Sequence, residues 1–166
     1  SDIASLKGGR CWHWLCLDKA MTCSSSPPSV GQQLAHTRQG AHPFCYVCSA
    51  SNPMGLALRY AAAPDGSVSA TFLGNPALEG YEGIMHGGVV AALLDGAMTN
   101  CLFAQGIRAL TGDLRIRYRS PVIVAEELTV RAWVESSCHE LFHLQAELKQ
   151  GSEIKARAQG KFMRTQ

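Results

Sequence analysis

The sequence predicts an α+β domain in which an antiparallel sheet of five or six strands wraps around one long buried helix. Between Val89 and Ala104 the chain is apolar all round except for Asp95, Thr99 and Asn100, which is typical of a buried helix. Segments in which apolar and polar residues alternate lie on both sides of this helix and predict strands with one buried face. The chain has 166 residues, 46% of them hydrophobic, which is enough for one domain with a sizeable core.

The composition argues against several partners and locations. A formal net charge of +2 is too small to indicate nucleic-acid binding. The run 84–104 is as long as a membrane span, but its His, Asp and Asn side chains predict a soluble core helix, so we expect no membrane partner. No small-residue cleavage site follows the apolar residues near the N-terminus, so we expect no signal peptide. Seven cysteines without framework spacing favour reduced thiols and a cytoplasmic protein.

Residues 1–40 differ from the rest and are predicted to form an N-terminal extension before a domain at 41–166. A run of Ser and Pro and the lack of a sustained period indicate this arm. A short helix is expected near 30–36. Three apolar residues of the arm are candidates for packing on the domain or on a partner: Trp12, Trp14 and Leu15.

Turn residues separate the predicted strands. After a turn at 52–55, residues 56–60 begin the first strand, and a Pro-Asp-Gly turn joins it to a second strand at 67–72 as a hairpin. A loop at 74–83 then leads into the long helix. Four alternating segments follow, and their inward residues are Leu114, Ile116 and Tyr118, then Leu128, Val130, Ala132 and Val134, then Phe142, Leu144, Ala146 and Leu148, then Ile154, Ala156 and Ala158.

Cys45 and Cys48 form a Cys-x-x-Cys pair within HPFCYVCSASNPMGL. A zinc knuckle or a redox pair is one interpretation. A zinc site needs a second pair of ligands, however, and neither a second Cys-x-x-Cys nor a suitable His pair follows. We therefore expect no metal site and no cofactor.

The start of the helix and its one carboxylate are the most informative features of the chain. Gly87 and Gly88 follow His86 and leave the first backbone N–H groups uncovered, so that they can bind an anion or an oxyanion. Asp95 lies in the middle of the helix, where a charge is costly unless it is paired, hydrated or used in chemistry.

From Cys45 to Met163 the chain resembles hotdog-fold acyl-CoA thioesterases of the phenylacetate-pathway and THEM-like type. The residues that carry the resemblance are the Cys-x-x-Cys and NPMGL opening, the HGG at 86–88 followed by Asp95, and the LTGDLRIRYRSP segment with Thr111. The resemblance implies the hotdog fold and hydrolysis of an acyl-CoA thioester to free acid and CoA. It also implies that the site lies at a subunit interface.

The resemblance implies a role for individual residues. Gly87 would supply an oxyanion-hole N–H, Asp95 the base or nucleophile, and Thr111 a hydroxyl that orients water or the carboxylate. Many relatives place an Asn or Gln shortly before the glycine. Here residues 80–83 offer no side-chain amide, and His86 is the nearest substitute for a second donor.

The residues themselves support the same chemistry. A thioester carbonyl becomes an oxyanion in the transition state, and an N–H at a helix N-terminus stabilises it. A carboxylate short of water and held by a donor such as Thr111 is a better base than a solvated one, whether Asp95 activates water or attacks the carbonyl. The alternatives are a structural carboxylate at Asp95, a simple strand-edge residue at Thr111, and a helix-entry residue bonded to the backbone at His86.

The substrate-binding candidates are Gly88 at the helix start and three arginines of one predicted strand, Arg115, Arg117 and Arg119. The arginines alternate with apolar residues, so one interpretation is a solvated or oligomer-facing sheet surface. The other is that a subset binds the phosphates of coenzyme A, because guanidinium groups bind anionic phosphate well.

The spacing of the two main candidates predicts the assembly. Gly87 and Asp95 are eight residues apart, which places them about 12 Å apart along a helix axis. One thioester cannot easily be served by both from a single chain. We therefore expect an obligate homodimer, or a tetramer built of such dimers, in which Gly87 of one chain meets Asp95 of the other.

Two other classes of function share these features. A hotdog hydratase or dehydratase would need a His and a carboxylate facing each other, and the HGG helix start fits hydrolysis better. A non-catalytic acyl-CoA-binding protein would keep the pocket without a base, and Asp95 argues against it.

Overall fold

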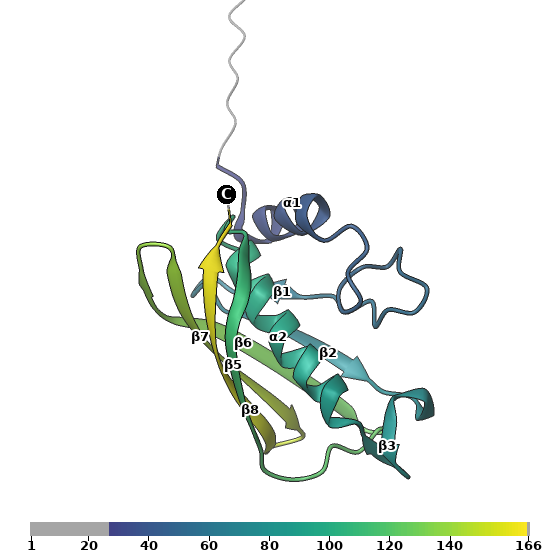
Figure 1. Ribbon diagram of the computed structural model, residues 1–166. Coiled ribbons are helices and arrows are strands. Elements are labelled where there is room, and N and C mark those ends of the chain that lie inside the picture. The colour runs from purple at the N-terminus through teal and green to yellow at the C-terminus, as the bar shows by residue number, and fades with distance from the viewer. Residues whose placement is uncertain (1–26, 166) are drawn as a thin grey trace, which may run out of the picture.

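The computed structural model describes residues 27–165, and its elements are arranged around one long helix (Figure 1). In chain order they are α1 (Val30–Ala41), β1 (Ala61–Ala62), β2 (Val68–Leu73), η1 (Pro76–Leu78), β3 (Glu79–Tyr81), β4 (Ile84–Met85), α2 (Gly87–Phe103), β5 (Ala109–Tyr118), β6 (Glu127–Cys138), β7 (Leu141–Gln150) and β8 (Glu153–Arg164).

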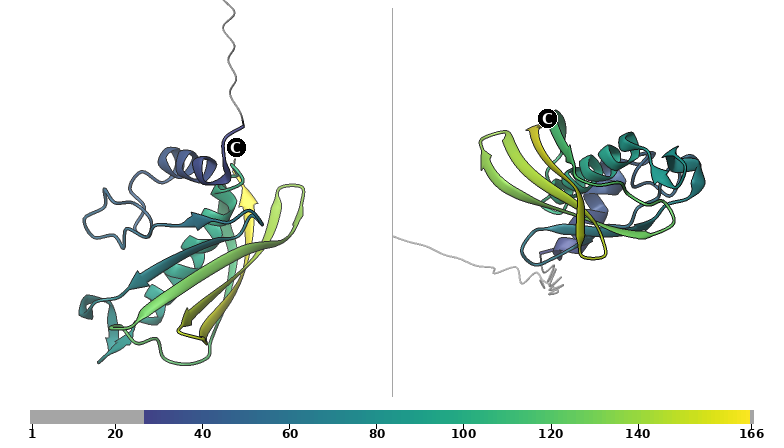
Figure 2. Two further views of the ribbon diagram at one scale, coloured as in Figure 1. Left: turned by 180° about the vertical axis from the view of Figure 1, so that it is seen from behind. Right: turned by 90° about the horizontal axis from the view of Figure 1, so that it is seen from below.

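Six strands form one antiparallel sheet in the order β1-β2-β6-β7-β8-β5. The sheet curves around α2, which lies across its concave face (Figures 1 and 2). A separate two-stranded ribbon, β3-β4, precedes the helix. The predicted α+β architecture is confirmed.

Buried and more exposed residues alternate along the central strands, and the buried ones form the core. Ala132, Ala146 and Ala158 occupy paired positions on β6, β7 and β8 and are buried. Small residues here let the helix approach the sheet closely. A Cβ at Gly160 would stand only 3.1 Å from the sulfur of Met98 on α2, so this contact depends on the absence of a side chain at residue 160.

The structure differs from the sequence prediction in two loop regions. Residues 56–60 are not a strand of the sheet, and β1 begins only at Ala61. Their backbone is held elsewhere, because Leu56 N–H donates to the carbonyl of Tyr46 and Leu58 N–H to the carbonyl of Val47. The predicted loop at 74–83 contains η1 and β3. A hairpin with a turn after Pro64 is present as predicted, but its first arm is β1 at 61–62 instead of 56–60.

The prediction of a helix buried on all sides is wrong for one strip of α2. Most of the helix is buried, but Gly88 is exposed and Ala91, Ala92 and Asp95 are half-buried. These four residues, at positions 88, 91, 92 and 95, lie on one side of the helix and form what we call the outward strip of α2. The sheet of one chain covers only one side of the helix, so the strip remains available to another surface.

Helix α1 covers the C-terminal half of the structure's long helix. It begins with a capping box at Ser29 and Gln32 and packs against α2, with Leu34 only 3% exposed. The short helix predicted near 30–36 is therefore present and longer than expected. The packing expected of Trp12, Trp14 and Leu15 concerns residues outside the described range. No helix within residues 27–165 is long and apolar enough to cross a membrane.

Candidate functional site

His86 caps the N-terminus of α2. The side-chain Nδ1 of His86 accepts a 2.9 Å hydrogen bond from the Gly88 N–H, and the backbone N–H of His86 donates to the carbonyl of Leu78. A Cβ at Gly88 would stand 2.9 Å from the same Nδ1, so this cap requires glycine there. An imidazole that accepts at Nδ1 carries its proton at Nε2 when neutral. The expected helix-entry contact of His86 is thus present, and its Nε2–H is left as a donor.

The Gly87 N–H is the other donor at this helix start. It has no hydrogen-bond acceptor among residues 27–165, while the carbonyl of Gly87 accepts a 2.9 Å bond from the Tyr118 hydroxyl. Both His86 and Gly87 line a pocket of about 550 Å³. The other residues that line it are mostly apolar or aromatic: Tyr81, Ile84, Met85, Val90, Tyr118, Arg119, Pro121 and Val122 among them.

Asp95 and Thr111 are brought together by α2 and β5. The Thr111 hydroxyl donates a 2.7 Å hydrogen bond to Asp95 Oδ1. An irregularity in the β5–β8 register between Thr111 and Asp113, at Gly112, accompanies this approach. The carboxylate is half-buried rather than deeply buried, which corrects the expectation drawn from its apolar neighbours in the sequence.

Asp95 does not line the pocket beside Gly87. Within one chain, the structure therefore unites Asp95 with Thr111 and unites Gly87 with His86, but it places the two pairs apart along α2. This separation agrees with the helix geometry on which the composite site was predicted.

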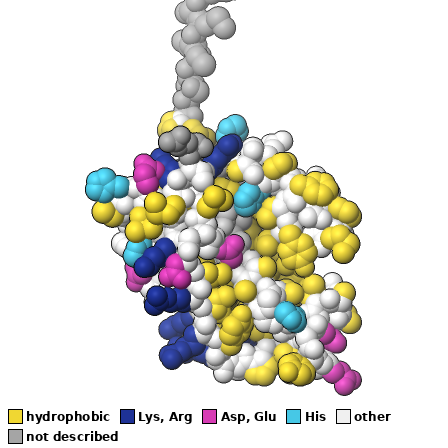
Figure 3. Space-filling view, viewed as in Figure 1, with side chains coloured by type: hydrophobic (Ala, Val, Ile, Leu, Met, Phe, Trp, Pro, Cys, Tyr) yellow, Lys and Arg dark blue, Asp and Glu magenta, His cyan; other side chains and the backbone are white. Residues whose placement is uncertain are grey.

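The three arginines lie on the outer face of the sheet. Arg115, Arg117 and Arg119 line a second pocket, of about 340 Å³, with Arg157 of β8, and basic side chains gather along the left flank of the molecule in Figure 3. Arg115 pairs with Asp113 at 3.4 Å. Arg119 also lines the pocket beside Gly87, so it connects the two pockets.

A cluster of possible metal ligands that was not predicted from the sequence lies at the C-terminal end of α1. His42, Cys45 and Cys48 hold their ligand atoms within 4.8 Å of one another. Burial lowers the pKa of His42, although the charge of Asp95 acts in the opposite direction. Burial and the neighbouring Cys45 raise the pKa of the Cys48 thiol to about 11. The signal was present in the sequence as His-x-x-Cys-x-x-Cys, with the histidine before the pair rather than after it.

Residues 82–156 match the thioesterase superfamily, a stretch that contains α2, β5, β6 and β7 and the start of β8. Over these residues the chain is similar to the thioesterase superfamily, and it has the hotdog fold of solved thioesterases.

One curated relative is the acyl-coenzyme A thioesterase THEM4 of Mus musculus. The chain is 30% identical to it over 64 residues, which are 39% of this chain and 27% of the relative. The match therefore spans less than a third of that relative's length.

Two solved structures share the fold. The E. coli PaaI protein from the phenylacetic acid degradation operon has a TM-score of 0.70 at 17% identity, covering 83% of this chain and 97% of that one. The protein smu.793 from Streptococcus mutans, solved bound to acetyl-CoA, has a TM-score of 0.61 at 17% identity, covering 65% of this chain and 88% of that one.

Proposed function

We propose that this protein is an acyl-CoA thioesterase that hydrolyses an acyl-CoA thioester to the free acid and CoA. The observation that carries the proposal is the Asp95 carboxylate, which is half-buried on the outward strip of α2 and fixed by a 2.7 Å hydrogen bond from Thr111. A carboxylate held in one orientation on a partly desolvated surface is suited to act on a bound thioester. The match of residues 82–156 to the thioesterase superfamily supports the same chemistry.

The thioester oxygen would lie against the start of α2. The Gly87 N–H has no acceptor within residues 27–165 and sits at the positive end of the helix dipole. The Nε2–H of His86 is the nearest candidate for a second donor to the oxyanion. The apolar lining of the adjoining pocket suits an acyl group.

The reaction breaks the C–S bond of the thioester. In one route Asp95 takes a proton from water while the water oxygen bonds to the carbonyl carbon. In the other route the Asp95 carboxylate bonds to that carbon, and water then hydrolyses the anhydride that results. In both cases the negative charge on the carbonyl oxygen is stabilised at Gly87. The CoA thiolate leaves and is protonated, and the acid is released.

A homodimer, or a tetramer built of such dimers, would complete the site. Two α2 helices packed antiparallel through their outward strips would bring Gly87 of one chain toward Asp95 of the other. The edge strand β5 supports an interface on this side, because it carries the exposed side chains of Leu110 and Tyr118. Exposed apolar residues along an open strand edge are typical of a surface that a partner covers.

The phosphates of coenzyme A would bind arginines at the C-terminal end of β5 and just after it. Arg117 and Arg119 form no ion pair within the described residues, so their guanidinium groups are free to bind phosphate. Arg119 lines both pockets and so stands where the phosphates and the thioester end of one substrate would connect. The bound acetyl-CoA of smu.793 supports a ligand of this kind.

The test is incubation of the protein with acyl-CoAs of short, long and aromatic acyl groups and a thiol reagent. We expect hydrolysis of at least one of these acyl-CoAs, which releases free CoA thiol and raises the absorbance of the reagent. A hydratase would change the acyl group without releasing thiol, and an acyl-CoA-binding protein would retain the substrate unchanged. Either of these results would replace the proposed function.

A further inference from the structure

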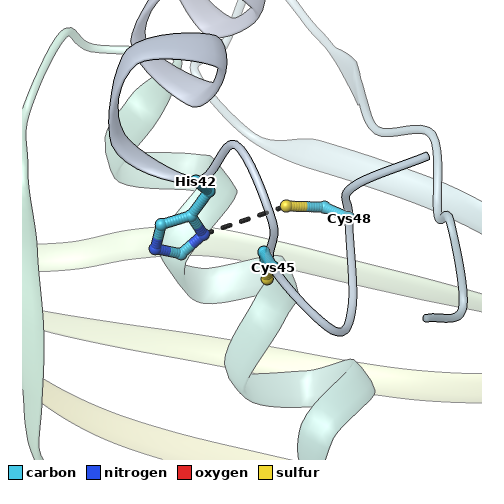
Figure 4. Close-up of side chains that lie close together, drawn as sticks. All are labelled: His42, Cys45 and Cys48. Atoms are coloured by element: carbon cyan, nitrogen blue, oxygen red, sulfur yellow. Dashed lines mark hydrogen bonds between the residues drawn. The ribbon is translucent and has the colours of Figure 1, made fainter. Parts of the chain in front are cut away.

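The loop after α1 presents three side chains to one point. His42 ends α1, where its N–H donates to the carbonyl of Arg38, and the chain then turns so that the Ser49 N–H donates to the carbonyl of Cys45. Figure 4 shows His42, Cys45 and Cys48 around this turn. Hydrogen bonds from residues 56 and 58 to the carbonyls of residues 46 and 47 fix the loop on the domain.

The spacing of the three ligand atoms is close to that of a metal site. All three lie within 4.8 Å of one another, and His42 Nδ1 lies 3.9 Å from Cys48 Sγ. In a tetrahedral zinc site, bond lengths of about 2.0–2.3 Å place neighbouring ligand atoms roughly 3.5–3.8 Å apart. Small side-chain rotations would therefore close the observed cluster around an ion.

We propose that His42, Cys45 and Cys48 bind one divalent transition metal of the zinc class. Two thiolates and an imidazole are the donor set that Zn²⁺ prefers, while Mg²⁺ and Ca²⁺ prefer oxygen. The set leaves a fourth position for water or another ligand.

A buried acceptor beside the cluster fits a polar fourth ligand. Asn100 of α2 is 1% exposed and lies beside Cys48, and its Oδ1 has no hydrogen-bond partner within residues 27–165. Its amide nitrogen donates to the carbonyl of Gly96. A buried unsatisfied oxygen calls for an explanation, and a metal-bound water is one donor that would satisfy it.

The ion would stabilise the conformation in which the loop packs on α2. The His42 ring packs edge-on against Phe103, with centroids 4.8 Å apart, and Val47 packs against Gly96. Both Phe103 and Gly96 belong to α2, which also carries Asp95. The metal is thus assigned a structural role near the proposed active site and takes no part in the hydrolysis.

The decisive measurement is the zinc content of the full chain, prepared reduced, equilibrated with Zn²⁺ and freed of excess metal. Because the chain holds seven cysteines and six histidines, variants identify the ligands. Wild type should retain roughly one Zn²⁺ per chain at this site, and Cys45→Ser and His42→Gln should each lose it. The matched control is Cys138→Ser, which removes the thiol of an exposed Cys–His pair whose atoms lie 3.3 Å apart and which should retain the ion.

Cobalt substitution of the wild type tests the site without relying on the folding of a variant. Two thiolate ligands give a charge-transfer absorption with Co²⁺, and tetrahedral coordination gives intense visible bands that Zn²⁺ abolishes. A wild type without these bands would overturn the proposal. So would equal zinc content in wild type and Cys45→Ser, or a Cys45–Cys48 disulfide that forms in air in the presence of Zn²⁺.

Discussion

The Asp95 carboxylate carries the proposed chemistry, and its replacement should abolish turnover. Asp95→Asn keeps the volume and removes the charge, so we expect the hydrolysis rate to fall by far more than tenfold while folding persists. Retention of more than about a tenth of the wild-type rate, a barrier change under about 1.4 kcal/mol, would contradict the assignment. Asp65→Asn makes the same change at an exposed turn carboxylate that pairs with Arg131, and it should leave the rate nearly unchanged.

Thr111 is proposed as a positioning residue, so its hydroxyl should matter more than its size. Thr111→Val removes the 2.7 Å bond to Asp95 and should lower kcat, though by less than Asp95→Asn does. Thr111→Ser keeps a donor and should retain most of the activity. Rate measurements on the two variants decide the matter, and equal activity of Thr111→Val and wild type would leave Thr111 as a plain strand residue.

Asp95, Gly87 and Thr111 could be proposed as site residues from the sequence, but their surroundings could be predicted only in part. A lone carboxylate in an apolar helix is visible from its neighbours in the chain, whereas its degree of burial depends on which side of the helix the sheet covers. His42 is not evident from the sequence as a partner of Cys45 and Cys48, because it precedes the pair, whereas the usual zinc patterns place further ligands after it. The cap formed by His86 was expected as an alternative, and its tautomer follows only from the hydrogen bond to Gly88.

At the scale of elements, α2 depends on glycine at residue 96, where the loop that follows α1 and contains Cys45 and Val47 packs against it. A Cβ at Gly96 would stand 2.7 Å from Cγ1 of Val47, a buried side chain with little room to move. Overpacking of this kind typically costs about 1–3 kcal/mol, against a gain in helix propensity of up to about 1 kcal/mol. Gly96→Ala should therefore lower the free energy of unfolding by about 1–2 kcal/mol in urea denaturation.

A second background separates the clash from other effects of this substitution. Val47→Ala removes the methyl group that the new Cβ would meet at 2.7 Å but leaves the Tyr60 hydroxyl at 3.1 Å, so Gly96→Ala should cost clearly less in the Val47→Ala background than in wild type. An equal penalty in both backgrounds would show that the contact between α2 and the loop is not the cause.

Strand β5 offers a separate test of coenzyme A binding. Replacing both Arg117 and Arg119 by Gln should raise KM for acyl-CoA about tenfold, which corresponds to about 1.4 kcal/mol. KM for the N-acetylcysteamine thioester of the same acyl group should not change, because that substrate has no phosphates. Arg131→Gln, on β6, is the matched control. A similar rise in KM for both thioesters would remove these arginines from phosphate binding.

The strands were predictable where their alternation reflects one buried and one exposed face. This holds for β6, β7 and β8, whose inward residues form the core. It fails at 56–60, because that segment is extended but bonds to the Cys45 loop instead of to the sheet. Such a partner lies outside any local pattern, and only the three-dimensional arrangement reveals it.

At the scale of the whole molecule, the outward strip of α2 is the surface through which two chains would form the proposed site. Gly87 and Asp95 belong to the same helix, yet Gly87 lines the apolar pocket and Asp95 does not. The sequence placed both residues on the helix correctly. The sequence could not show that the strip between them stays uncovered within one chain, because an apolar helix has the same sequence pattern whether a sheet or a second helix covers it.

The measurement that tests this central claim most directly is complementation between two inactive variants. One is Asp95→Asn. The other is Gly87→Pro, which deletes the N–H at the first position of the helix, where proline is tolerated and where the preceding residue already has φ −59° and ψ 133°, a conformation compatible with proline. Gly87→Ala keeps the N–H, and its Cβ would lie 3.7 Å from the Tyr118 ring, so it serves as the active control.

After the two inactive variants are unfolded together and refolded with random pairing, about half of the dimers are mixed and each has one intact site. Thiol release from acyl-CoA should therefore recover to about a quarter of the wild-type rate. If Gly87 and Asp95 of the same chain served one thioester, every site in a mixed dimer would lack one of them. A mixture that stays inactive, or a monomer that hydrolyses acyl-CoA, would contradict the account.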